Sequence, residues 1–166
     1  MPGTHEYTVD IDWQGNLGTG TSGYRDYSRQ VEIRSIAADP IAGSADKPFR
    51  GDPERWNPEQ LLLAALAQCH LLSYLYAAVT AGVVVTDYRD AAVGTLTEDG
   101  AASGAFTDVL LRPVVTVASA EMVEAATAAH AEAHRLCFIA NSVNFPVRHE
   151  PTILVAESPG VGSVTA

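Results

Sequence analysis

Basic residues are scarce in this chain, which has 10 Lys and Arg against 20 Asp and Glu and a formal net charge of −10. Nucleic-acid binding needs Lys and Arg to neutralise phosphates, and anionic membrane surfaces attract proteins through the same residues. The charge balance therefore argues against nucleic acid and membranes as partners. The N-terminus shows no basic segment followed by an apolar run, so we expect no secretory signal and a cytoplasmic location.

Cysteine is also scarce, since the chain has only Cys69 and Cys137. Two cysteines are too few for a disulfide scaffold, and 166 residues suffice for one domain with a core of its own. We predict a single domain over residues 1–156 and a disordered tail over 157–166. In a reducing compartment a cysteine pair is catalytic, metal-binding or inert, and a free cysteine in an apolar run is most simply a small core residue.

The most apolar stretch predicts a long helix with Cys69 in its middle. Asn57 suits the N-cap, Pro58 the first helical position and Gln60 the reciprocal position of a capping box. Gly82 is the predicted stop. Leu and Ala surround the helix on nearly all sides, which indicates burial, and polar residues interrupt the run too often for a membrane span. We predict a core helix that a partner subunit could share.

The remaining patterns predict an α+β fold. Predicted strands cover 5–13, 30–36, 83–96, 105–117 and 147–155, a long connection covers 37–56, and a second helix covers 119–144. The strands over 83–96 and 105–117 are expected to form a hairpin. Because strands and helices do not alternate strictly, antiparallel pairs are expected rather than a doubly wound sheet.

The helix alone predicts an inert Cys69. Apolar neighbours raise the pKa of a thiol, and the middle of a helix is too far from its N-terminus to benefit from the dipole. A reactive Cys69 therefore needs a cation from elsewhere, and the preceding loop offers Arg50 and Arg55. Glu59 lies roughly 15 Å from Cys69 along a straight helix. It can orient an arginine or serve the thiol of a partner helix, which suggests an active site at a homodimer interface.

The motifs around this helix resemble those of the OsmC/Ohr family of hydroperoxide-reducing proteins. The matching segments are Asn57-Pro58-Glu59-Gln60-Leu61-Leu62 and Ala65-Leu66-Ala67-Gln68-Cys69-His70, with Cys137 at the matching distance. The resemblance covers roughly residues 5–155. It implies an OsmC-like fold, with antiparallel sheets around a long central cysteine-bearing helix and a second helix, in an intertwined homodimer with two sites at its interface.

The resemblance also implies roles for individual residues. Cys69 becomes the peroxidatic thiol that is oxidised to a sulfenic acid, and Cys137 the resolving thiol that forms a disulfide with it. Glu59 matches the carboxylate that pairs with an activating arginine. Arg50 lies much as in OsmC proteins, Arg25 lies nearer to the Ohr position, and Arg55 ranks third.

The implied activity is thiol-dependent reduction of organic hydroperoxides in defence against oxidative stress. No cofactor or metal is expected. An external dithiol, either a lipoyl group or a small molecule, would reduce the disulfide again.

Two alternatives remain. The first is a non-catalytic dimeric protein of the same fold whose interface pocket binds a small hydrophobic molecule. The second is a metal site, because His130, His134 and Cys137 have the i, i+4, i+7 spacing of ligands on one helix, although a closed zinc site needs a fourth ligand. His70 and His149 are predicted to be packing or surface residues.

Overall fold

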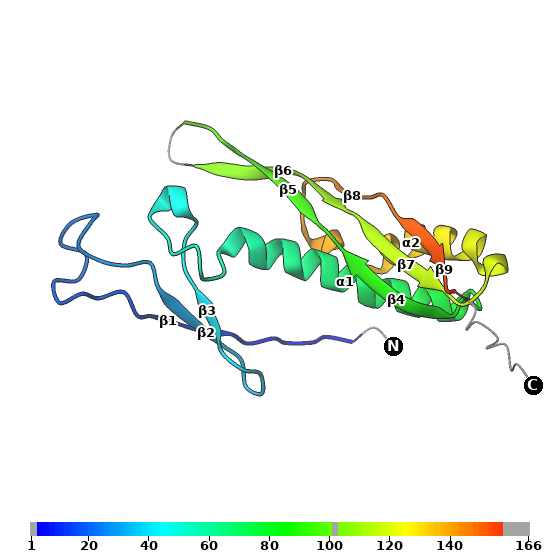
Figure 1. The fold of residues 1–166 in the computed structure, drawn as a ribbon. Coiled ribbons are helices and arrows are strands. Elements are labelled where there is room, and N and C mark those ends of the chain that lie inside the picture. Colours follow the sequence, from blue (N-terminus) through cyan, green and yellow to red (C-terminus); the bar gives the residue numbers. More distant parts are fainter. Residues whose placement is uncertain (1–2, 101–102, 158–166) are drawn as a thin grey trace, which may run out of the picture. The chain divides into compact units, whose positions relative to one another are not determined.

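The computed structural model describes residues 3–100 and 103–157, and the chain divides into two compact units, Met1–Leu62 and Leu63–Ala166 (Figure 1). Each unit is described by itself. The predicted tail lies outside the described residues except for Glu157. A single domain over 1–156 stays a prediction.

The first unit is built on a three-stranded antiparallel sheet. Its strands are β1 (Asp10–Trp13), β2 (Val31–Arg34) and β3 (Ile41–Gly43), paired in the order β1-β2-β3. The two predicted strands are present but shorter. The third lies within the predicted connection, because three residues are too few to show an alternating pattern. A short 3₁₀ helix follows at Lys47–Phe49.

The long helix α1 (Pro58–Thr80) begins and ends as predicted. The amide of Gln60 donates to Asn57 Oδ1 at 2.8 Å and the amide of Asn57 donates to Gln60 Oε1 at 3.2 Å, which is the reciprocal capping box. At the other end Gly82 has φ 72°, and the amide of Val83 donates to the carbonyl of Ala78 at 2.9 Å. Glycine suits this left-handed position because a Cβ would be strained there.

One face of α1 is buried and another is open. Leu66, His70 and Tyr74 are almost fully buried, whereas Leu72, Tyr76 and Val79 are 59%, 67% and 77% exposed. By length and composition alone α1 could cross a membrane, with a mean hydropathy of 1.6 over its most apolar 18 residues, of which 28% are buried. Core helices of soluble proteins meet the same criterion.

The second unit holds two three-stranded sheets of mixed direction. One has the order β4 (Val85–Asp90), β7 (Pro113–Val117), β9 (Thr152–Val155), and the other the order β5 (Val93–Glu98), β6 (Gly104–Leu111), β8 (Val147–His149). The pairs β5–β6 and β4–β7 are antiparallel, whereas β8 and β9 pair parallel to β6 and β7. The α+β prediction is confirmed, and the parallel pairs are an addition to it.

Each long strand predicted in this unit is in fact two strands that belong to different sheets. The break near residue 112 is held by the side chain of Asp90, whose Oδ1 accepts the amide of Arg112 at 2.7 Å. Pro113, which has no N–H to donate, opens the next strand. The predicted hairpin is present as β5–β6, and its antiparallel pairing continues in the other sheet as β4–β7.

The second helix α2 (Val123–Leu136) is shorter than predicted. Cys137 takes an extended conformation, with φ −70° and ψ 106°, so the expected continuation to residue 144 is wrong. The side-chain amide of Asn141 donates to the carbonyl of Arg135 at 3.1 Å, which satisfies one of the last carbonyls of the helix. The core of the unit joins Tyr74 of α1 to side chains of α2 and β7, among them Ala126, Val115 and Val117.

Candidate functional site

The second unit brings the two cysteines together. Cys69 is partly exposed in the middle of α1, while Cys137 is 1% exposed just after α2. Burial and a hydrogen-bond interaction with the thiol of Cys69 raise the pKa of Cys137 to about 11. The amide of Ala140 also donates to Cys137 Sγ at 3.3 Å. Both cysteines are free thiols in this structure.

This arrangement gives the two thiols unequal chemistry. Cys137 is protonated at neutral pH, so it is a poor nucleophile until a base or a reactive neighbour removes its proton. Cys69 is the thiol that a small molecule can reach. Two thiols in contact can form a disulfide once one of them has been oxidised.

Glu59 lies in the first turn of α1 and is partly buried. Its Oε2 atom is buried and has no hydrogen-bond partner within the described part of the chain. A buried carboxylate oxygen without a partner is unfavourable, so this position suits an incoming cation or hydrogen-bond donor.

Of the three candidate arginines, Arg50 lies near Tyr24 in the first unit, and Arg25 is the neighbour of Tyr24 in the chain. The guanidinium carbon of Arg50 lies 5.9 Å from the centre of the Tyr24 ring. Arg50 has a left-handed backbone, with φ 65°, at the end of the 3₁₀ helix. Both arginines are exposed, and neither forms an ion pair with any residue in 3–100 or 103–157.

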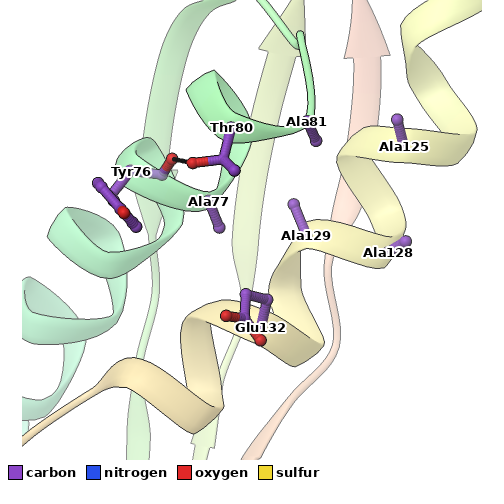
Figure 2. Close-up of a pocket in the computed structure, with 8 residues that line it drawn as sticks. All are labelled: Tyr76, Ala77, Thr80, Ala81, Ala125, Ala128, Ala129 and Glu132. Atoms are coloured by element: carbon purple, nitrogen blue, oxygen red, sulfur yellow. Dashed lines mark hydrogen bonds between the residues drawn. The ribbon is translucent and has the colours of Figure 1, made fainter.

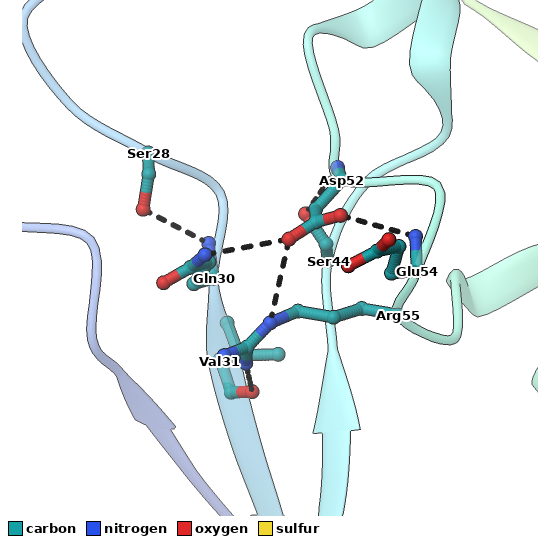
Figure 3. A network of polar contacts seen from close by, with 7 residues as sticks. All are labelled: Ser28, Gln30, Val31, Ser44, Asp52, Glu54 and Arg55. Atoms are coloured by element: carbon teal, nitrogen blue, oxygen red, sulfur yellow. Dashed lines mark hydrogen bonds and ion pairs between the residues drawn. The ribbon is translucent and has the colours of Figure 1, made fainter.

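The guanidinium of Arg55 binds residues of its own unit (Figure 3). Its Nε lies 3.7 Å from Asp52 Oδ2, and its Nη1 donates to the carbonyl of Val31 at 3.5 Å. The carboxylate of Asp52 also accepts from the amide of Glu54 at 3.0 Å and from the side chain of Gln30 at 3.4 Å. Arg55 thus connects the loop to β2. This structural role agrees with its place as the third candidate for the activating arginine.

Arg29 is a structural residue that the sequence reasoning missed. Its guanidinium lies over two aromatic rings, 4.3 Å from the centre of Tyr24 and 4.1 Å from that of Tyr27. It also donates to both of their carbonyls, at 2.9 Å and 2.8 Å. Arg29 therefore fixes the turn that carries Arg25 and contacts Arg50. An irregular turn has no periodic pattern, so only the closely spaced tyrosines could have hinted at it.

The three residues of the alternative metal site point to different neighbours. His130 Nδ1 lies 3.0 Å from His70 Nε2, whereas Cys137 faces Cys69. Across the described residues, no group of three or more His, Cys, Asp or Glu is arranged to hold a metal ion. His70 is buried and His149 is partly buried, and the centres of their rings are 5.4 Å apart.

Each unit also carries an apolar groove. The groove of the first unit has a volume of about 470 Å³ and is lined mainly by Trp13, Tyr27, Ile33, Trp56 and Leu61. The groove of the second unit has a volume of about 520 Å³ and lies between α1 and α2, where Tyr76, Ala77 and Ala129 line it (Figure 2). Glu132 contributes a single charged side chain to its rim.

Comparison with known proteins confirms the resemblance seen in the sequence. A family model described as OsmC-like protein matches residues 51–152. The comparison with curated proteins finds no match. Among solved structures, an OsmC-like protein of unknown function from Vibrio cholerae is 29% identical with a TM-score of 0.78, and the match covers 89% of this chain and 99% of that one.

Two further solved structures share the fold at low identity. An organic hydroperoxide resistance protein from Elizabethkingia anophelis is 13% identical with a TM-score of 0.66, over 94% of this chain and 100% of that one. Another from Legionella pneumophila is 16% identical with a TM-score of 0.62, over 93% of this chain and 100% of that one. The chain belongs to the OsmC-like protein family.

Proposed function

We propose that the protein is a thiol-dependent peroxidase that reduces organic hydroperoxides in defence against oxidative stress. The observation that carries this proposal is the contact between a partly exposed thiol, Cys69, and a buried one, Cys137. That some structural neighbours are named organic hydroperoxide resistance proteins supports the same activity. A cytoplasmic location, where dithiol reductants are available, is part of the proposal.

The proposed reaction has three steps. The thiolate of Cys69 attacks the terminal oxygen of the hydroperoxide, the O–O bond breaks, and the alkoxide leaves as an alcohol after taking a proton. Cys69 is then a sulfenic acid. Cys137 loses its proton and attacks the sulfur of Cys69, so that water leaves and a disulfide forms. A lipoyl group or another external dithiol reduces this disulfide by exchange.

We propose that an arginine paired with Glu59 activates the Cys69 thiol across a homodimer interface, because Glu59 lies roughly 15 Å from Cys69 along its own helix. The unpartnered Oε2 of Glu59 supports this pairing, because it is an acceptor that a guanidinium would satisfy. Arg50 is the first choice and Arg25 the alternative. Arg55 is the least suitable, because it already forms an ion pair with Asp52.

Substitution of each arginine by alanine should rank the candidates. Arg50→Ala should slow alkylation of Cys69 by iodoacetamide at neutral pH by about 10-fold, because the thiolate loses its counter-charge. Arg25→Ala should have a smaller effect. Arg55→Ala is the matched control, which should weaken the loop but leave the alkylation rate near that of the wild type. A slow Arg25→Ala beside an unchanged Arg50→Ala would transfer the role to Arg25.

We propose that a second copy of the chain covers the open face of α1. Leu72, Tyr76 and Val79 make this face apolar and exposed, and Tyr76 also lines the groove in Figure 2. Large exposed apolar patches on soluble proteins mark contact sites. Light scattering at micromolar concentration should give the mass of a dimer. The mass of a monomer would contradict the shared site.

The activity itself is tested by following the loss of peroxide. The wild type with dithiothreitol should consume cumene hydroperoxide faster than hydrogen peroxide, since most side chains of α1 around Cys69 are Leu and Ala. Absence of turnover with either peroxide would sink the proposal. It would favour the alternative function, a small dimeric protein that binds a hydrophobic molecule in an apolar groove such as that in the first unit.

A further inference from the structure

The described part of the second unit contains a cluster of four histidines from three elements. His70 lies on α1, His130 and His134 lie on α2, and His149 lies on β8. Ring centres are 5.4 Å apart for His70–His130 and for His70–His149, and 5.9 Å apart for His130–His149. His134 lies 5.8 Å from His149. Four of the five histidines of the chain thus pack together.

The centre of this cluster is a direct contact between α1 and α2. His70 Nε2 and His130 Nδ1 are 3.0 Å apart, and the two side chains are 1% and 0% exposed. A hydrogen bond at this distance needs one ring to donate and the other to accept, so the pair shares a single proton between these two atoms. The other nitrogen of His130, Nε2, is buried and has no hydrogen-bond partner within the described residues.

Among the described residues, no ion pair supplies the histidine pair with a compensating negative charge. Tyr74 of α1 stacks on His130 with ring centres 4.0 Å apart, and its ring centre is 5.8 Å from that of Tyr88 of β4. Asp90 ends β4, and burial raises its pKa, which disfavours its charged form. Burial also lowers the pKa of His70 to about 4 and that of His130 to about 3. His134 and His149 are further titratable groups beside the pair, and positive charge on either lowers the pKa of His70.

The histidine pair lies next to the cysteine pair on both helices. His70 follows Cys69 directly on α1. On the other side, the amide of Cys137 donates to the carbonyl of His134 at 3.3 Å, and His130 lies one turn earlier on α2. The contact that holds α1 to α2 at the histidines therefore also fixes the separation of the helices at the thiols.

We propose that His70 and His130 are positioning residues that hold Cys69 and Cys137 in the geometry of disulfide formation only while both imidazoles are neutral. The inference deepens the proposed peroxidase, because it concerns the step that closes the disulfide. A second proton on the pair makes both facing nitrogens donors, so the hydrogen bond between the helices becomes a repulsion. The two cysteines then separate, and the disulfide becomes harder to form.

The test measures how readily the disulfide forms against glutathione, so it does not depend on any peroxidase activity. Each reduced protein is equilibrated with glutathione and its disulfide at pH 7 and pH 3, with a selenol catalyst to speed exchange. Two protein thiols give up two electrons and two protons, and oxidised glutathione takes them up as two thiols. The ratio of oxidised to reduced protein gives the effective concentration of one cysteine at the other. Circular dichroism shows at each pH that the chain is folded.

Three variants are compared with the wild type, one that cannot take up the proton and two controls. The wild type should lose about 10-fold in effective concentration between pH 7 and pH 3, because a histidine with a pKa of about 4 is mostly protonated at pH 3. The double variant His70→Gln/His130→Asn keeps amide groups at the positions of the facing nitrogens but cannot take up a proton, so its value should not change with pH. Tyr74→Phe, which removes the bond from Tyr74 to the carbonyl of Ala126 at 3.2 Å, is a packing control and should follow the wild type. Exposed His5→Gln should do the same.

Two results would overturn the inference. One is a folded wild type whose effective concentration is the same at both pH values. The other is a double variant that falls with pH as steeply as the wild type. Failure of the peroxidase assay with an acid-sensitive disulfide would reject the proposed activity and leave the role of the histidine pair intact.

Discussion

Replacement of Cys69 by serine is expected to abolish peroxide consumption, with a loss of about 100-fold or more in kcat/KM. A serine hydroxyl is a far weaker nucleophile than a thiolate at neutral pH, and it cannot store the oxidising equivalent as a sulfenic acid. The loss should appear with cumene hydroperoxide and dithiothreitol, while the circular dichroism spectrum stays that of the wild type. Activity that survives in Cys69→Ser would refute the assigned nucleophile.

Cys137→Ser is the matched control for this experiment, because it removes the other thiol of the same pair. The variant should still react once with peroxide at Cys69, since the attacking thiol is intact. Without its resolving partner the sulfenic acid persists and becomes sensitive to further oxidation. Trapping with dimedone should therefore label Cys137→Ser strongly and the wild type weakly.

Acid is expected to destabilise the protein well before its carboxylates are protonated. Burial lowers the pKa of His70 to about 4 and that of His130 to about 3 in the folded chain, whereas a histidine in the unfolded chain has an ordinary pKa near 6.5. The unfolded state therefore binds more protons as the pH falls. The contribution of the two neutral histidines to the free energy of unfolding is fully present above pH 6.5 and is lost progressively below it. By pH 4 the loss is on the order of 3 kcal/mol for each of the two histidines.

Thermal unfolding between pH 7.5 and pH 4.5 measures this effect. The midpoint should fall by roughly 10 °C in the wild type, given the few degrees per kcal/mol of a domain of this size. The fall should be much smaller in His70→Gln/His130→Asn, while His5→Gln should follow the wild type. Asp90 acts in the opposite sense, because its raised pKa favours the folded state as the pH falls. A midpoint that does not change with pH in the wild type would contradict the burial of neutral histidines.

The elements that could be predicted from the sequence are those with local causes. Both ends of α1 follow from short-range hydrogen bonds, at Asn57 and Gln60 and at Gly82, and the structure has them as expected. The α+β class follows from the order of the patterns. The burial of one face of α1 could be predicted in the same way, but not the exposure of the other, because the helix is apolar all round.

The features that could not be predicted depend on contacts between distant residues. The change of sheet near Pro113 rests on Asp90, 22 positions before Arg112, and the proline is its main local sign. The parallel pairing of β8 and β9 is likewise set by the sheets that they join. The helix α2 ends at Leu136 although the pattern continues, because Cys137 turns toward α1 and Asn141 caps the helix.

Part of the candidate site could also be predicted from the sequence, and part could not. Its cysteines were named from the sequence, and the structure adds that the two thiols are neighbours. The histidine cluster was missed, because His70, His130 and His149 are far apart in the chain and each has an ordinary packing role when it is considered alone. Among the candidate arginines, only the ion pair of Arg55 with Asp52 could be predicted from the sequence, because the two residues are three positions apart.

The most direct test of the central claim is the oxidation state of the two thiols after one equivalent of cumene hydroperoxide. The reduced protein is treated without any external thiol and analysed by intact mass and by mapping of disulfide-linked peptides. We expect the loss of two hydrogen atoms per chain, a disulfide bond between Cys69 and Cys137, and one equivalent of the alcohol. Two free thiols beside unconsumed peroxide would contradict it.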